Sequence, residues 1–334
     1  GDAPKSRSGG RFFEITGLVG GRVEEEAVFG DTHRLSRELV HGGVVDGLRI
    51  DHIDGLADPL GYLQRLRQAT GPDCYITVEK ILGKGEQLPP DWPVSGTTGY
   101  EFIASLAEVL VDDSSLERLE RSHNETLGVT ADRRAELRDA KGLMTDRNFE
   151  GEFTTLLALA SALAERNGVE LQRDDVRHAL RELLIAFPVY RTYGTAEGLT
   201  PPDVALLNRV IAGVNASEAA LSLIVRILLG DLPESDRDTA ALFRTRFQQL
   251  TGPLMAKSVE DTLFFRHNLE LALNEVGAHP TPRAFSFSRF HKAMRIRLAR
   301  PPDALLGTTS HATNRGEHAR APLYTRTDAS ERWG

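Results

Sequence analysis

The stretch HGGVVDGLRIDHIDGLADPL, residues 41–60, runs from a short apolar segment into a cluster of charged side chains. Alternation with a period of two predicts a strand over residues 41–51, with Arg49 and Asp51 on one face and apolar side chains on the other. Charges at the end of a buried strand are typical of a strand that leads into an active site, because an unpaired charge is too costly in a core. A solvated turn is the simpler alternative.

A helix and a second strand follow this first strand. An aspartate–proline pair supplies an N-cap and a proline at the first helical position, and leucines recur every three residues up to Leu66. The string CYITVEKI, residues 74–81, predicts a second strand with Glu79 on the face opposite its apolar side chains. This βαβ order predicts two parallel strands joined by a right-handed crossover.

The two carboxylates are predicted to share one edge of the sheet. Catalytic residues of α/β barrels project from the carboxyl ends of the strands, so Asp51 and Glu79 would face one cleft. Two carboxylates facing one cleft are the groups that glycosidic chemistry uses. A separation of about 5 Å favours double displacement through a covalent intermediate, and a wider gap favours inversion by water. Spacing along the chain leaves both mechanisms open.

The composition argues against several classes of protein. The net charge of −8 disfavours binding to nucleic acid. No apolar run approaches the roughly 18 residues of a membrane span, so no membrane partner is expected. Cys74 is the single cysteine, which rules out a disulfide framework and a cysteine-based zinc site. The polar, glycine-rich start has no apolar core of a secretion signal, so we expect a cytoplasmic protein.

Three zones differ in composition. Residues 1–103 mix short β-like segments with glycine and proline turns, residues 104–250 are rich in alanine, leucine, arginine and glutamate, and residues 251–334 return to short mixed segments. We therefore expect an α/β fold that is part of a (β/α)8 TIM barrel. The first zone would carry Asp51 and Glu79, the second would be a large all-α insertion, and the third would return to the barrel.

Several long strings resemble the maltooligosyl trehalose synthases of the α-amylase family. The R-x-D and V-E-K motifs alone indicate only an α-amylase-type barrel, whereas WPVSGTTGYEF, residues 92–102, is more specific to the synthases. The resemblance covers nearly the whole chain. The other strings that carry it are GRFFEITGLVGGRVEEEAVFGDTH (10–33), GLRIDHIDGLADPLGYLQRLR (47–67), FPVYRTYGT (187–195) and FQQLTGPLMAKSVEDTLFFRHNLELALNEVG (247–277).

This resemblance implies a reaction and a set of roles. The synthases move the reducing-end linkage of a maltooligosaccharide from α-1,4 to α,α-1,1, as intramolecular isomerases without metal or organic cofactor. Asp51 resembles their nucleophile and Glu79 their general acid/base. Arg49, on the same strand face, would favour the charged form of Asp51. Residues that resemble substrate contacts are Arg49, His52, Tyr100, Lys257 and His311, although each has an ordinary structural role as its alternative.

The chain departs from the synthase pattern in two ways. Synthases carry a third carboxylate in a segment T-H-D-T-K-R-S-E-D, and the aligned string SHATNRGEHAR, residues 310–320, has Ala312 at the aspartate position. Glu317 is the nearby acid that would have to substitute. The family also has strands that would precede Gly1 and a portion that would follow Trp333. We therefore expect a central segment that is marginally stable or associates, with little or no synthase activity.

Three other functions stay open. A barrel of this type that admits water would hydrolyse α-1,4-glucans. A site without its third carboxylate would be a non-catalytic protein that binds α-glucan. In the last alternative the helical zone is an interaction scaffold and the two acids are incidental.

Overall fold

The computed structural model describes residues 21–128, 132–268, 271–280, 286–299 and 303–328. Contacts divide the chain into two compact units. The first, called the helical unit here, contains residues 54–58 and 138–258. The second, called the α/β unit, contains the described parts of residues 21–53, 59–137 and 259–334. The two units are described separately.

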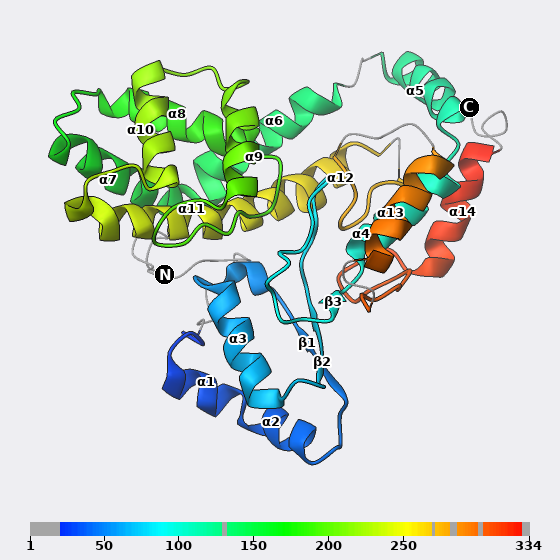
Figure 1. Cartoon of the computed structure of the whole chain (residues 1–334). Coiled ribbons are helices and arrows are strands. Elements are labelled where there is room, and N and C mark those ends of the chain that lie inside the picture. The colour runs from blue at the N-terminus through cyan, green and yellow to red at the C-terminus, as the bar shows by residue number, and fades with distance from the viewer. Residues whose placement is uncertain (1–20, 129–131, 269–270, 281–285, 300–302, 329–334) are drawn as a thin grey trace, which may run out of the picture. The chain divides into compact units, whose positions relative to one another are not determined.

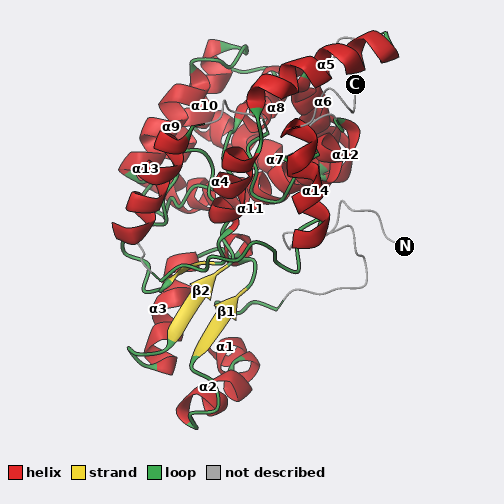
Figure 2. Ribbon diagram, turned by 90° about the vertical axis from the view of Figure 1, so that its right-hand side faces the viewer, coloured by secondary structure: helices red, strands yellow, loops and turns green. Residues whose placement is uncertain are grey.

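The α/β unit contains a small parallel sheet. Its strands are β1 (Gly47–Ile50), β2 (Tyr75–Val78) and β3 (Gly96–Thr97), in the order β1-β2-β3, and two of them, β1 and β2, are seen in Figure 2. Arg49 lies opposite Thr77, and Ile50 lies opposite Val78, with β1 and β2 parallel. The predicted parallel pairing of the two strands is confirmed.

The first strand is shorter than the predicted span of residues 41–51. Helix α2 (Arg34–His41) includes the first of those residues, and Gly43 then adopts a φ of +65° in the turn that ends it. Val44, which the alternation placed in the strand, is 70% exposed. Two consecutive glycines favour a turn after a helix over an extended strand, so β1 begins only at Gly47.

Helix α3 (Pro59–Thr70) connects β1 to β2, as the sequence predicts. Its apolar stripe is buried, with Leu63 and Leu66 fully inaccessible. The helix packs against α2, and α1 (Glu26–Thr32) lies beside α2 (Figure 1). His33 Nε2 and the hydroxyl of Tyr62 lie 2.7 Å apart, which joins the start of α2 to the middle of α3.

The rest of the described α/β unit consists of helices and the loops between them. Helix α4 packs against α13, and α5 packs against α14. Their bounds are α4 (Tyr100–Leu110), α5 (Asp113–Leu127), α12 (Phe264–Arg266), α13 (Phe287–Ala299) and α14 (Glu317–Asp328).

The helical unit packs its helices around one apolar core (Figure 1). Helix α7 packs on α11 and on α8, and α10 packs on all three. Pairs of apolar residues one turn apart, such as Leu223 and Ile227 in α10, are buried at 2% and 0% exposure. The helices of this unit are the later part of α6 (Arg133–Leu143), α7 (Glu150–Arg166), α8 (Arg173–Ala186), α9 (Pro201–Ile211), α10 (Glu218–Leu229) and α11 (Arg237–Ser258).

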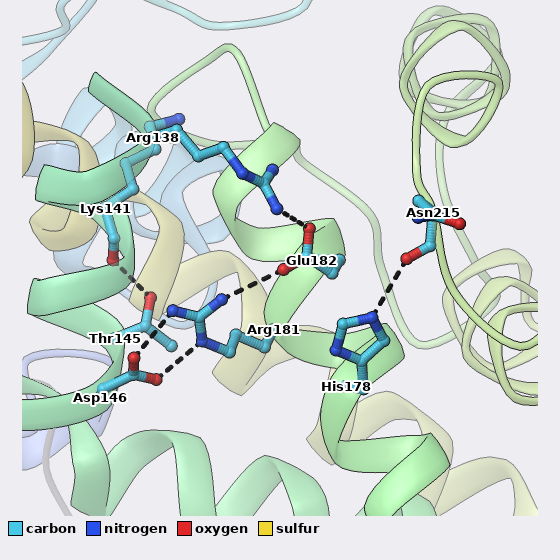
Figure 3. A network of polar contacts seen from close by, with 8 residues as sticks. All are labelled: Arg138, Lys141, Thr145, Asp146, His178, Arg181, Glu182 and Asn215. Atoms are coloured by element: carbon cyan, nitrogen blue, oxygen red, sulfur yellow. Dashed lines mark hydrogen bonds and ion pairs between the residues drawn. The ribbon is translucent and has the colours of Figure 1, made fainter. Parts of the chain in front are cut away.

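Ion pairs join α6, the π-helical segment Met144–Asn148 that follows it, and α8 (Figure 3). Arg181 binds Asp146 through two nitrogens, at 2.9 Å and 2.8 Å. It also pairs with Glu182 at 3.1 Å, and Arg138 pairs with the other oxygen of Glu182. The hydrogen bond from Arg181 and its charge outweigh partial burial and lower the pKa of Asp146. Glu182, 5% exposed, is therefore a buried carboxylate with cations on both oxygens.

Lys141 is a buried cation in the same region. It is 4% exposed, and its Nζ donates a hydrogen bond of 2.5 Å to the carbonyl of Phe187. Burial lowers the pKa of Lys141 to about 8. The ordinary value of about 10.4 applies in the unfolded chain, so the unfolded state holds more protons between these two pH values.

This difference predicts that the free energy of unfolding rises as the pH is raised from about 8 to about 10.4, by up to about 3 kcal/mol in total. Below pH 8 the ammonium is charged in both states, and its contribution is constant. Urea unfolding followed by circular dichroism across this range measures the rise. Lys141→Met removes it, and Lys292→Met, at an exposed position of α13, retains it. An identical pH dependence in Lys141→Met and wild type would contradict this assignment.

Candidate active site

Asp51 and Glu79 occupy matching positions at the carboxyl ends of neighbouring strands. Asp51 directly follows β1 and Glu79 directly follows β2. The ladder continues one step beyond the last paired residues, since the Glu79 amide donates to the carbonyl of Ile50 at 2.7 Å. Neighbouring strands lie about 4.8 Å apart, so the two acids belong to one edge of the sheet.

Arg49 forms an ion pair with Asp51 across one strand face. Its Nη2 lies 2.9 Å from Asp51 Oδ1, and the side chains are 33% and 59% exposed. Burial acts to lower the pKa of Arg49, but hydrogen bonds and charge interactions with Asp51 and Tyr100 outweigh it and raise that pKa. The pairing of Arg49 with the aspartate two residues later agrees with the alternation in the sequence.

His52 connects the two carboxylates through its backbone. Its φ is +49°, in the left-handed region that few non-glycine residues adopt. In this conformation its amide donates a hydrogen bond of 2.7 Å to Glu79 Oε2. The residue after Asp51 therefore holds the side chain of Glu79, which strand periodicity alone does not predict.

The pKa of Glu79 is raised. Burial of the carboxyl is the main cause, and the negative charge of Asp51 acts in the same direction. The hydrogen bond from the His52 amide and the electrostatic interactions with Arg49 and His311 oppose this rise in the pKa of Glu79. A carboxyl that keeps its proton at higher pH than an ordinary glutamate is suited to act as a general acid.

Tyr100 and the segment around residue 310 lie beside Arg49. The Tyr100 hydroxyl is 3.1 Å from Ser310 Oγ, and Arg49 Nη1 donates to the same oxygen at 3.5 Å. Ser310 Oγ is also 3.5 Å from Nδ1 of His311. Burial, together with the charge of Glu79, raises the pKa of Tyr100. Sequence reasoning missed Ser310, whose only signal is its place directly before His311.

Hydrogen bonding beyond the end of β3 holds the segment of the chain that leads to Ser310. The Leu305 amide donates to the carbonyl of Thr97 at 3.1 Å, which extends the hydrogen bonding beyond β3. Gly96 permits the approach, because a Cβ there would lie 2.5 Å from the Cα of Ala304. Gly99 has a φ of +92°, and a Cβ at this position would lie too close to the carbonyl oxygen of Leu305.

The loop after His311 carries no carboxylate at its next position, which is Ala312. Two nearby acids, Glu317 and Glu275, bind groups of the chain close to this loop. Glu317 accepts a hydrogen bond from the Thr308 hydroxyl at 3.1 Å. Glu275, 2% exposed, accepts the amides of residues 314 and 315 at 2.6 Å and 3.1 Å. These contacts hold the loop on which Ala312 lies.

The predicted site residues are distributed over both units. Asp51, Glu79, Arg49, Tyr100 and His311 come together in the α/β unit through the contacts above. His52 contributes its amide to this group. The last predicted residue, Lys257, lies in the last turn of α11, in the helical unit.

Two features are absent from the part of the chain that the structure describes. None of the helices in this part of the chain is both long and apolar enough to cross a membrane. Over the same residues, no group of three or more histidine, cysteine, aspartate or glutamate side chains is placed to hold a metal ion.

Several known proteins are similar to this chain over most of its length. No family model matches the chain. A putative maltooligosyl trehalose synthase of Mycobacterium tuberculosis is 32% identical over 313 residues, which are 94% of this chain and 39% of that protein. The structure of maltooligosyltrehalose synthase from Arthrobacter ramosus matches with a TM-score of 0.80 and 34% identity, over 93% of this chain and 39% of that one.

A hypothetical maltooligosyl trehalose synthase of Sulfolobus tokodaii matches with a TM-score of 0.72 and 26% identity, over 93% of this chain and 38% of that one. The α/β segment with its small parallel sheet thus aligns to part of larger structures. The chain spans 39% of the length of the curated relatives it matches. It is homologous, over that share of their length, to the maltooligosyl trehalose synthases.

Proposed function

We propose that Asp51 and Glu79 perform retaining glycosidic chemistry on maltooligosaccharides, and that the reaction is the one of maltooligosyl trehalose synthases. The observation that carries the proposal is the placement of the two acids at adjacent ends of paired parallel strands. Residues at matching positions of neighbouring strands point to the same face, so both carboxyls can enter one cleft, as a retaining enzyme requires. The homology supports the choice of substrate.

We also propose the fold to which the residues of this site belong. The three strands are a section of a (β/α)8 barrel, whose catalytic residues lie at the carboxyl ends of its strands. Residues 1–103 and 251–334 supply barrel segments, and residues 104–250 are a helical insertion. The parallel sheet supports this assignment. The helical unit supports an insertion over residues 138–250, whereas residues 104–137 belong to the α/β unit.

In the first step the Asp51 carboxylate attacks the anomeric carbon of the next-to-last glucose. The bond to the reducing-end glucose breaks, and Glu79 donates its proton to the departing oxygen. Arg49 forms an ion pair with Asp51 at 2.9 Å, and burial favours the protonated form of Glu79. The products are a maltooligosyl-enzyme and a bound glucose.

In the second step the released glucose turns and attacks through its anomeric hydroxyl, and Glu79 takes back a proton. The bond to Asp51 breaks, and two inversions retain the α configuration. Water is the competing acceptor, so the glucose must be held in place while solvent is excluded. We assign the substrate contacts to Arg49, His52, Tyr100, Lys257 and His311.

A second candidate function rests on Ala312. The position next to His311 lacks the carboxylate that stabilises positive charge in the transition state, and loss of such a group commonly lowers the rate by about 10²–10³-fold. A chain of this kind binds α-glucan with little or no turnover. Hydrolysis of α-1,4-glucan is the result if water reaches the glycosyl-enzyme first.

Incubation with maltopentaose distinguishes these functions when reducing ends and free glucose are followed together. Turnover by the proposed reaction removes reducing ends without release of glucose, because an α,α-1,1 linkage has no free anomeric carbon. A gain in reducing ends indicates hydrolysis. Saturable binding without any change in reducing ends indicates glucan binding alone and contradicts the proposed reaction.

A further inference from the structure

The turn after the first strand is held by a buried arginine of the helical unit. The Asp54–Asp58 turn belongs to that unit by its contacts. Arg191, 2% exposed, donates to the carbonyl of Asp54 at 2.6 Å, to that of Leu56, and to that of Ala57 at 3.2 Å. One guanidinium thus binds three main-chain oxygens within four residues.

Two further side chains hold the same turn. The Tyr193 hydroxyl donates to Asp54 Oδ1, and Asp54 is 8% exposed. Gln249 Nε2 donates to the carbonyl of Gly55 at 3.0 Å. The guanidinium of Arg191 lies over the ring of Tyr193, 5.6 Å from its centre. The turn therefore has partners for four successive residues, 54–57, and little freedom to move.

A planar guanidinium fixes such a turn more strictly than an ammonium does. Its N–H groups point in fixed directions, so each carbonyl must stay in line with one of them. Loss of one partner inside a protein leaves the other polar groups buried without a hydrogen bond, which is costly because water cannot replace it. The main chain of the turn is therefore set by Arg191.

The chain connects this turn directly to the candidate catalytic acids. Ile53 alone separates Asp54 from His52, whose φ is +49° and whose amide binds Glu79 Oε2 at 2.7 Å. A non-glycine residue keeps a left-handed backbone only where its surroundings fix it. The fixed turn on one side and the strand β1 on the other supply that constraint.

We propose that Arg191 is a positioning residue for the active site. By holding the Asp54–Asp58 turn through its carbonyl groups, it fixes the backbone of His52 and directs the His52 amide at Glu79. The kinetic consequence of this assignment rests on the proposed function, whereas its effect on the Glu79 carboxyl does not.

The predicted effect has a definite sign. The His52 amide stabilises the ionised form of Glu79 and so acts to lower its pKa. If the turn loosens, this hydrogen bond weakens and the pKa of Glu79 moves upward. A purely structural role of Arg191 would lower stability without moving this pKa.

Arg191→Lys keeps the charge but loses the directed N–H groups, and Tyr193→Phe removes one hydroxyl from the same turn. The pKa of Glu79 is measured by carboxyl-carbon NMR titration, with Glu79→Gln identifying its signal. We expect an upward shift in both variants, larger in Arg191→Lys. Tyr193→Phe still tests whether the turn acts on the pKa of Glu79 if Arg191→Lys does not fold.

Arg244→Lys is the matched control. Arg244 is 1% exposed and donates to the carbonyls of Thr195 at 2.7 Å, Ile227 at 2.8 Å and Leu228 at 2.8 Å, all within the helical unit. The exchange removes directed hydrogen bonds of the same kind from a different turn. It is expected to lower stability while leaving the Glu79 titration unchanged.

An unchanged Glu79 titration in folded Arg191→Lys or Tyr193→Phe overturns the proposal, as does an equal shift in Arg244→Lys. Where glucan turnover is measurable, kcat/KM of Arg191→Lys is expected to fall by about 10- to 100-fold, because small misplacements of catalytic groups have effects of this size. Absence of turnover in every form, together with a shifted Glu79 pKa, refutes the proposed function and leaves the positioning role intact.

Discussion

Asp51→Asn is expected to lower the release of fluoride from α-maltotriosyl fluoride by at least about 10³-fold. Fluoride leaves without protonation, so its release reports attack by the nucleophile alone. The amide of asparagine keeps the shape of the side chain but cannot form the glycosyl-enzyme. Asp51 directly follows β1 and is paired with Arg49, as a charged nucleophile requires.

Glu79→Gln tests the general acid/base role of Glu79 separately from the role of Asp51 as nucleophile. With maltopentaose, whose leaving group needs a proton, turnover is expected to fall by at least about 10²-fold. With the fluoride donor, the first step is expected to continue and the glycosyl-enzyme to accumulate, because the variant has no base for the second step.

Asp73→Asn is the control for both variants. This exposed acid lies just before β2, at the opposite end of the strand from Glu79. Its rates are expected to match those of the wild type. Equal rates in Asp51→Asn and Asp73→Asn would remove Asp51 from the mechanism.

Ala312→Asp is expected to raise the rate of fluoride release by about 10²-fold, since removal of a preorganised charged group has the inverse effect of about this size. Position 312 directly follows His311, which acts electrostatically on Glu79. A carboxylate there would stabilise the positive charge that develops at the anomeric carbon. The same negative charge would raise the pKa of Glu79 further.

Ala312→Asn separates charge from size. It adds a side chain of the same volume without the charge and is expected to leave the rate within a few-fold of the wild type. Equal rates in the two variants, or a rate in Ala312→Asp no higher than in the wild type, would show that position 312 does not act on the transition state. The glucan-binding alternative would then lose its physical basis.

Local patterns in the sequence predicted the parts of the fold that depend on neighbours along the chain. The strand that leads to Glu79, the proline at the start of α3 and the leucine stripe of that helix are all found. The strand before Asp51 was predicted too long, because alternation continues through Gly42 and Gly43 although two glycines favour a turn.

The contacts that complete the site could not be predicted in this way. Arg49 and Ser310 lie 261 residues apart in the sequence, and Arg191 binds a turn 134 to 137 residues before it. Such pairs depend on the tertiary fold and leave no periodic signal. The left-handed backbone of His52 is also unpredictable, because no local pattern marks a non-glycine residue for that conformation.

The most direct test of the account is to trap the glycosyl-enzyme. Glu79→Gln is incubated with α-maltotriosyl fluoride, and the protein is examined by intact-mass measurement and peptide mapping. The account predicts one maltotriosyl group esterified to Asp51, and no adduct when Asp51→Asn is added to the same variant. An adduct on another residue, or fluoride release with no covalent species at any time, would contradict Asp51 as the nucleophile.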